Sequence, residues 1–217
     1  MASRGTTPAD RQRPAPRLYL IAPQVSAGLT QLLEQAVNAA AVAAVLVPFA
    51  EGEEVTLLPD VKTLAPVVQD AGVAFLIEGN PQLAASAGAD GAHLEGFQAL
   101  KAALPVLKPE RIAGCGALRT RHDAMLAGEA GADYVMFGEP SRAGSRPPFH
   151  ALTERVAWWA ELFEVPCVGF ASSVEEVAPL AAAGADFVAL GAWVFSDYSR
   201  CNSTIAHAAS ALAGGTA

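Results

Sequence analysis

The sequence predicts an α/β fold, a single (β/α)8 TIM barrel, and two observations carry this prediction. The first is a phrase that occurs four times, at residues 71–75, 87–91, 130–134 and 183–187, in which an Ala-Gly pair leads from an alanine-rich stretch into an apolar run. Glycine can adopt the left-handed conformation that ends a helix, so each phrase marks a helix-to-strand joint. The phrases start 16, 43 and 53 residues apart, close to one, two and two βα units of roughly 20 to 30 residues.

The second observation is a series of eight short apolar runs. They lack the clean alternation of polar and apolar residues that marks a half-exposed strand, and such runs are typical of parallel strands that are covered on both faces. The predicted strands are Leu18–Ala22, Ala43–Val47, Ala74–Ile77, Gly91–Leu94, Ile112–Cys115, Tyr134–Phe137, Cys167–Phe170 and Phe187–Leu190.

Helical stretches separate and follow these strands, and eight strands alternating with eight helices close a barrel. A doubly wound open sheet is the alternative, but it would carry a glycine-rich fingerprint directly after the first strand. Residues 22–26 contain no glycine. The predicted helices are Leu29–Ala40, Val61–Ala71, Gln82–Ala87, Gly96–Leu104, Arg121–Ala130, Phe149–Phe163, Val174–Ala183 and Asn202–Leu212.

Length and composition fit one domain. A chain of 217 residues that is 52% hydrophobic can bury a large core. The apolar runs are far shorter than the ~20 residues of a membrane span, so we expect no membrane partner. We expect the barrel to occupy residues 17–213. Residues 1–16 are rich in arginine and proline and lack the apolar core of a secretory signal, which predicts a disordered basic tail.

The net charge limits the classes of binding partner, and the cysteine content indicates the cellular compartment. The net charge of −8 would repel a phosphate backbone, so the sequence predicts no nucleic-acid partner. The three cysteines are odd in number and widely spaced, without a Cys-x-x-Cys pair. This pattern argues against a disulfide framework or zinc and indicates a reducing, cytoplasmic compartment.

Catalytic groups of a barrel lie at the C-terminal ends of its strands. Glu78 and Glu95 directly follow the third and fourth predicted strands, and His93 lies within the fourth. A carboxylate in an apolar barrel mouth can have a raised pKa suited to acid–base work, and imidazole titrates near neutral pH. These three residues are the catalytic candidates, although the sequence alone assigns no complete catalytic set.

Four segments, residues 18–21, 87–94, 130–138 and 183–190, also carry a resemblance to a known family. In their order and spacing they resemble the thiamine-phosphate synthase family, whose superfamily also includes a thiazole tautomerase. The resemblance covers about residues 17–195. It implies a cytoplasmic transferase of thiamine biosynthesis that joins hydroxymethylpyrimidine diphosphate to thiazole phosphate and releases pyrophosphate with Mg²⁺. It also implies small phosphorylated partners and allows a homodimer.

The same resemblance implies a set of phosphate ligands. The family's Thr-x-Thr-Lys loop after the sixth strand matches residues 143–146, so Ser145 and Arg146 are the expected ligands, with Arg142 beside them. The family's Gly-Gly pair after the seventh strand matches Ser172 and Ser173. One of these serines is expected to cap the next helix, whose N-terminal amides can also bind phosphate. Gly191, after the eighth strand, completes the set.

Other ligand positions of the family are not matched. The Gln-x-Arg-x-Lys segment that grips the diphosphate aligns with Leu46, Pro48 and Ala50, and the two magnesium aspartates align near Glu78-Gly79 and Gln98. The resemblance thus implies Mg²⁺ as cofactor, but we predict no metal ligand. A diphosphate leaving group develops about two to three negative charges, which normally require a metal and several fixed donors.

Three functions therefore stay open. The first is the synthase reaction that the resemblance implies. The second is a barrel that keeps the fold without the transfer reaction and binds a small anionic ligand or a protein partner, since fold alone does not decide function. The third is a lyase or isomerase that uses Glu78, Glu95 or His93 as acid and base.

Overall fold

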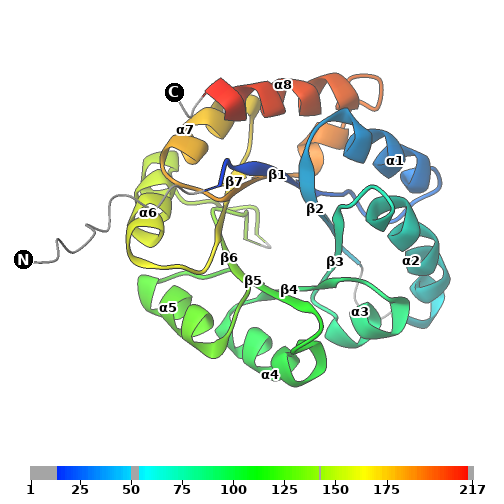
Figure 1. Ribbon diagram of the computed structural model, residues 1–217, viewed down its shortest axis with the longest axis horizontal. Coiled ribbons are helices and arrows are strands. Elements are labelled where there is room, and N and C mark those ends of the chain that lie inside the picture. Colours follow the sequence, from blue (N-terminus) through cyan, green and yellow to red (C-terminus); the bar gives the residue numbers. More distant parts are fainter. Residues whose placement is uncertain (1–13, 50–53, 142, 215–217) are drawn as a thin grey trace, which may run out of the picture.

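The computed structural model describes residues 14–49, 54–141 and 143–214, apart from the side chains of residues 54–57 and 60. Eight parallel strands pair in chain order, and β1 pairs with β8, which closes the barrel seen in Figure 1. The predicted (β/α)8 barrel is confirmed. The predicted tail falls largely on residues 1–13, which lie outside the described residues.

Every predicted strand is present, and no boundary differs by more than one residue. This agreement arises because each strand is an apolar run that is bounded by glycine, proline or charged residues. The strands are β1 (Arg17–Ile21), β2 (Val42–Val47), β3 (Ala74–Glu78), β4 (Gly91–Glu95), β5 (Ile112–Gly116), β6 (Tyr134–Phe137), β7 (Cys167–Ala171) and β8 (Phe187–Leu190).

Three helix predictions need correction. α2 begins at Glu54 rather than at Val61, and α4 continues through Pro105, because a proline removes only one backbone donor. The predicted helix from Val174 is a 3₁₀ turn followed by a short α-helix. The helices are α1 (Leu29–Ala39), α2 (Glu54–Gln69), α3 (Pro81–Ala87), α4 (Phe97–Leu107), α5 (Arg121–Ala130), α6 (Phe149–Leu162), η2 (Val174–Glu176), α7 (Val177–Ala182), η3 (Ala192–Phe195) and α8 (Cys201–Gly214).

The repeated Ala-Gly phrases lead into β3, β4, β6 and β8, which explains their spacing of one, two and two units. Three of them contain an aspartate, at the fourth position, that makes the same contact each time. Its carboxylate accepts the backbone N–H at the start of the preceding strand, and we call this contact the aspartate clamp. The clamps join Asp90 Oδ2 to the Phe75 N–H (2.7 Å), Asp133 Oδ2 to the Ala113 N–H (2.7 Å) and Asp186 Oδ2 to the Cys167 N–H (2.8 Å).

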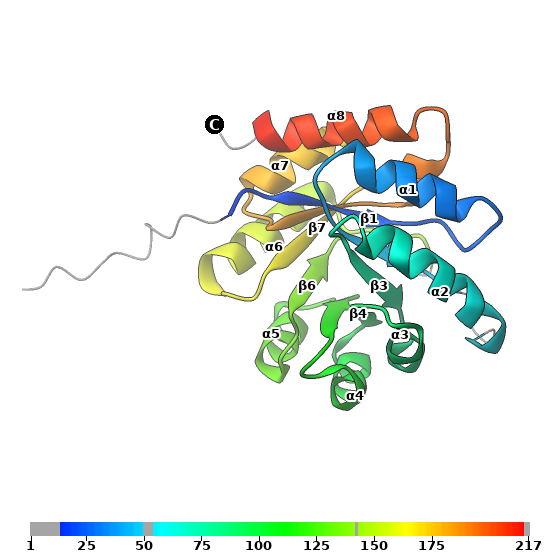
Figure 2. The same cartoon turned by 45° about the vertical axis from the view of Figure 1, so that its right-hand side comes forward.

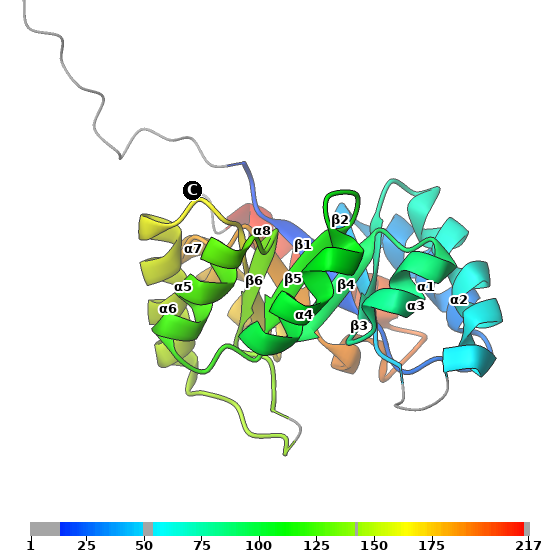
Figure 3. The same cartoon turned by 90° about the horizontal axis from the view of Figure 1, so that it is seen from below.

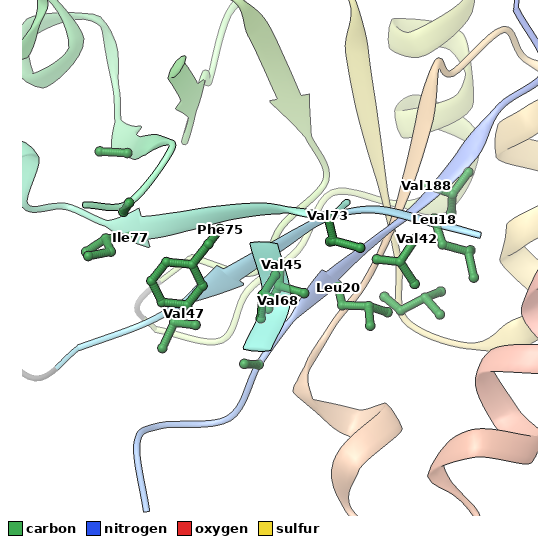
Figure 4. Packing of buried hydrophobic residues seen from close by; sticks show 14 of the residues in the cluster. Leu18, Leu20, Val42, Val45, Val47, Val68, Val73, Phe75, Ile77 and Val188 are labelled. Atoms are coloured by element: carbon green, nitrogen blue, oxygen red, sulfur yellow. The ribbon is translucent and has the colours of Figure 1, made fainter. Parts of the chain in front are cut away.

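The apolar residues form two concentric layers. The outer layer lies between the strands and the helices, and Figure 4 shows part of it, where Val45 and Phe75 of the barrel lie close to Val68 of α2. The inner layer fills the barrel itself. Its buried members are Tyr19, Ala44, Leu46, Leu76, Tyr134, Met136, Val168, Phe170 and Ala189.

The helices surround the barrel on its outside, as Figure 2 shows from a tilted direction. The connection between β6 and α6 projects from one end of the barrel, the end at which η3 also lies (Figure 3). This is the end where each strand runs into its following helix, and we call it the open end. No helix in the described part of the chain is long and apolar enough to cross a membrane.

Candidate functional site

The three catalytic candidates come together at the open end, on neighbouring strands. Glu78 is the last residue of β3 and pairs in register with His93 of β4. Glu95 ends β4 two residues later, so its side chain lies on the same face of the sheet as the His93 side chain. Strand pairing therefore places two carboxylates and an imidazole near one another.

His93 is the only charged or strongly polar side chain found buried in the described residues, with 3% of its surface exposed. Its Nδ1 lies 2.9 Å from the Tyr134 hydroxyl, which lies 2.9 Å from the Tyr19 hydroxyl. Burial lowers the pKa of His93 to about 4 and raises the pKa values of both tyrosines. At neutral pH His93 is therefore an uncharged imidazole that shares a chain of hydrogen bonds with two phenols.

Two glycines of β5 make room for this chain. A methyl group on Gly114 would overlap the ring of Tyr134. A methyl group on Gly116 would lie 2.5 Å from His93 Nε2 and even closer to Glu139 Oε1. His93 Nε2 and the Glu139 carboxylate therefore occupy the position that a side chain on residue 116 would need.

Glu139 is a site residue that the sequence analysis did not select. It stands two residues after β6, past Gly138, and its position at a strand end was the available signal. Its carboxylate accepts the N–H of Ala117, a non-glycine residue with a left-handed φ of 51°. Such backbone conformations cost free energy and are concentrated at functional sites.

Burial raises the pKa of Glu139 to about 7. The Ala117 N–H lowers it, the nearby Glu95 carboxylate raises it, and the Arg155 guanidinium lowers it. Glu139 is thus divided between its neutral and ionised forms near pH 7, the condition that favours an acid–base catalyst at that pH.

This pKa makes the stability of the protein depend on pH. Between pH 4.5 and 7 the folded chain keeps a proton on Glu139 that the unfolded chain has lost, so the free energy of unfolding should fall as pH rises through this range. Buried His93 acts in the opposite direction between about pH 4 and 6.5. Relative to the wild type, Glu139→Gln should gain about 3 kcal/mol between pH 4.5 and pH 8.

Urea unfolding of both proteins at the two pH values measures this gain. Glu129→Gln, on the surface of α5, is the matched control and should show no gain. If the stability difference between Glu139→Gln and the wild type is the same at both pH values, Glu139 titrates normally.

Arg146, a predicted phosphate ligand, binds groups of the protein itself. Its five N–H donors match five acceptor atoms, which are two carbonyl oxygens, one hydroxyl oxygen and both oxygens of one carboxylate. The contacts are Nε to the Gly138 carbonyl (3.1 Å), Nη1 to Ser172 Oγ (2.6 Å) and Glu176 Oε1 (2.9 Å), and Nη2 to the Phe170 carbonyl (3.0 Å) and Glu176 Oε2 (2.8 Å).

Glu176 also accepts hydrogen bonds from the two donors of Ser172. Its Oε2 accepts the Ser172 N–H at 2.8 Å and the Ser172 hydroxyl at 3.1 Å. Burial alone would raise the pKa of Glu176, but the hydrogen bonds from Arg146 and Ser172 outweigh it and the pKa is lowered. Glu176 is therefore an ionised carboxylate that is held by the residues to which the sequence analysis assigned phosphate.

The predicted serine cap is only partly correct. Ser173 is the residue before η2, but its side chain makes no capping hydrogen bond to the backbone. The Glu176 carboxylate instead turns back to the Ser172 N–H and hydroxyl. A carboxylate binds an amide donor more strongly than a neutral hydroxyl does, which explains why Glu176 rather than a serine accepts the backbone N–H here.

The other predicted phosphate ligands are placed as follows. The Ser145 hydroxyl lies 2.8 Å from the Ser141 hydroxyl in the β6–α6 connection. Arg142 lies outside the described residues. A methyl group on Gly191 would approach the Phe170 ring to 2.7 Å and the Trp193 ring to 3.2 Å. Two aromatic rings thus lie against the end of β8.

The described residues contain no preformed cluster of protein metal ligands. No group of three or more His, Cys, Asp or Glu side chains among them is arranged to hold a metal ion. Glu78 and Glu95 are the carboxylates nearest to the positions that the family resemblance suggests. Proteins commonly hold Mg²⁺ with one or two carboxylates together with substrate phosphates and water, so these two residues would hold the ion with a bound phosphorylated substrate. No reaction step is derived through a metal.

Comparison with known proteins shows to which family this chain belongs. Residues 18–194 match the sequence model of the family described as thiamine monophosphate synthase. The chain belongs to the thiamine-phosphate synthase family. The resemblance found in the sequence is thereby confirmed at the level of the family, and so is its association with thiamine biosynthesis.

Individual members of the family agree with this assignment. The thiamine-phosphate synthase of Rhodospirillum centenum is 38% identical over 184 residues, which are 82% of this chain and 89% of the relative. The thiamine-phosphate synthase of Hyphomonas neptunium is 36% identical over 208 residues, covering 88% and 92%. Thiamine phosphate pyrophosphorylase from Pyrococcus furiosus superposes with a TM-score of 0.76 at 16% identity, covering 93% and 97%, which shows the shared fold.

Proposed function

We propose that this member of the thiamine-phosphate synthase family no longer joins a pyrimidine diphosphate to a thiazole phosphate, and that its open end serves another small ligand. The observation that carries the proposal is the position of Glu176. Its carboxylate uses the Arg146 guanidinium and the Ser172 amide and hydroxyl, which are among the donors that the family resemblance assigns to phosphate.

Two further features support the proposal. The rings of Phe170 and Trp193 lie against Gly191, where a phosphate would approach the end of β8. The positions that align with the family's diphosphate grip hold Leu46 and Pro48, which carry no positive charge. Stabilising a departing diphosphate requires several fixed donors, and these positions supply none through their side chains.

The coupling assay tests this directly. Purified protein is incubated with hydroxymethylpyrimidine diphosphate, thiazole phosphate and Mg²⁺, and thiamine phosphate is quantified by chromatography. We expect no product above the buffer background, with the Rhodospirillum centenum relative run in parallel. Product formed at a rate similar to that of the relative would overturn the proposal.

A binding experiment tests the role of Glu176 separately. Calorimetry with inorganic phosphate and pyrophosphate should give no measurable binding to the wild type. Glu176→Gln removes the competing charge and should bind at least one of the two anions. The adjacent Glu175→Gln, which leaves the Arg146 contacts intact, is the control.

The alternative function is the synthase reaction itself. It is favoured by the relatives, since three of them, including one from Erythrobacter litoralis at 34% identity, carry the name thiamine-phosphate synthase. In that case phosphate must displace the Glu176 carboxylate from Arg146 during binding, and the coupling assay gives product.

A further inference from the structure

An apolar patch lies on the outside of the barrel, on the neighbouring helices α5 and α6 (Figure 1, Figure 3). Only three large hydrophobic side chains of the described residues are exposed, and two of them, Met125 and Leu162, are on these helices. Their exposed fractions are 36% and 62%. Trp158, which is partly exposed, lies one helical turn before Leu162. Three large apolar groups thus meet water on one side of the barrel, on a surface that the proposed function does not use.

A cation–π contact joins these groups into a single surface. The Arg121 guanidinium lies over the Trp158 ring, 4.8 Å from its centroid, and so connects the start of α5 to α6. Met125 follows Arg121 by four residues and Leu162 follows Trp158 by four, so each pair shares one face of its helix. We call the surface formed by these four residues the α5–α6 face. Tryptophan and arginine are enriched where proteins associate, and their truncation often costs the most binding energy.

The two helices are held in fixed positions beneath this face. Arg155 of α6 donates from Nη1 to the Leu118 carbonyl, 2.9 Å away, in the connection before α5. A methyl group on Gly128 of α5 would lie 3.2 Å from the Trp159 ring, so the buried indole of α6 packs close to the α5 backbone. A surface that is already fixed in this way loses little conformational entropy when it binds a partner.

The end of the face at the start of α5 is basic. Three arginines there outnumber two carboxylates, and one of these carboxylates, that of Asp123, is taken up by the capping box of α5. Arg119, Arg121 and His122 are exposed. The charged and titratable side chains at this end are Arg119, Arg121, His122, Asp123, Glu154 and Arg155.

The opposite end of the face, where α5 and α6 finish, is acidic. Glu129, Glu161 and Glu164 are exposed there. Residues 123–132 and 156–166 contain no lysine, arginine or histidine that could offset these carboxylates. The α5–α6 face therefore has a basic end and an acidic end, and its apolar side chains lie between them.

We propose that the α5–α6 face binds the same face of a second copy of this chain, in an antiparallel arrangement that places the basic end of each copy against the acidic end of the other. A two-fold axis makes every contact occur twice, so one face supplies both halves of the charge complementarity. A parallel arrangement would place like charges together, which costs binding energy. The apolar side chains are then buried at the centre of the interface, inside a charged rim. This dimer goes beyond the proposed function and does not depend on it.

Sedimentation velocity over a series of protein concentrations tests the association. The wild type should dimerise reversibly, and Leu162→Asp should raise the dissociation constant about 30-fold or more, because it places a charge in the apolar centre. Tyr198→Asp is the matched control and should leave this constant unchanged. Tyr198 is also 62% exposed, but it lies outside the face, between η3 and α8. A wild type that stays monomeric at every soluble concentration, or a dimer that Leu162→Asp does not weaken, overturns the proposal.

A charge exchange tests the antiparallel arrangement. Arg119→Glu and Glu161→Arg should each weaken self-association, because either change opposes like charges at both ends of the dimer. A mixture of the two variants should associate about tenfold or more tightly than either variant alone, since each supplies the charge that the other lacks. Far-ultraviolet circular dichroism checks that both variants are folded. No gain on mixing would overturn the arrangement, and because no coupling substrate is present, this failure is distinct from failure of the proposed function.

Discussion

Trp159→Ala should lower the free energy of unfolding by about 3–5 kcal/mol and the midpoint of thermal unfolding by roughly 10 °C. Trp159 is fully buried, its ring stacks on Phe163 at 4.1 Å, and its edge meets Phe137 of β6. Its indole N–H donates to the Val165 carbonyl at 2.7 Å. Truncation therefore leaves a cavity between α6 and the barrel and removes the partner of a carbonyl before β7.

The neighbouring Trp158 is the matched control for this change. It is partly exposed on the same helix, and its ring packs against the Arg121 guanidinium and Phe163. Trp158→Ala should cost about 1 kcal/mol, since most of its contacts are near the surface. Urea unfolding followed by far-ultraviolet circular dichroism measures both variants. Similar losses for the two would mean that the Trp159 packing contributes little.

Breaking the Arg146–Glu176 pair should destabilise the open end of the barrel. Both side chains are 17% exposed, and the guanidinium joins the β6–α6 connection to β7 and η2. Arg146→Ala and Glu176→Ala should each cost about 2–3 kcal/mol, because each leaves a largely buried charge without its partner. In the double variant the losses should be less than additive by about 1–3 kcal/mol.

The Lys108–Asp133 ion pair provides the comparison for this cycle. Its side chains are 31% and 42% exposed, and exposed pairs contribute little. A double-mutant cycle on this pair, measured by the same urea unfolding, should give a coupling energy below about 1 kcal/mol. A coupling of this small size for Arg146 and Glu176 would show that the pair is not held as tightly as its two hydrogen bonds indicate.

Much of the fold could be predicted because the information is local. An apolar run such as Tyr134–Phe137 and a helix-ending glycine such as Gly131 identify themselves within a few residues. Pro105 was misleading, since α4 continues past it to bury Leu107 completely. There a tertiary contact outweighed the local preference of proline to end a helix.

The candidate site could be predicted only in part. Position at a strand end pointed to Glu78 and Glu95, and His93 lay in a recognisable phrase. The pairing of Arg146 with Glu176 joins residues 30 positions apart across two connections, and no local pattern carries it. Glu139 was passed over because its significance comes from the bare Gly116 backbone on another strand, a relation that appears only when the barrel closes.

The aspartate clamps divide the ring of strands unevenly. They lock β3 to β4, β5 to β6 and β7 to β8, whereas Ala41 precedes β2 and the β1–β2 ladder slips in register between Leu18 and Tyr19. The barrel thus consists of three strand pairs that are each joined by an aspartate clamp, together with the β1–β2 pair, which has none. When segments are exchanged between family members, crossover points that fall between the clamped strand pairs should be tolerated far better than crossover points within a pair.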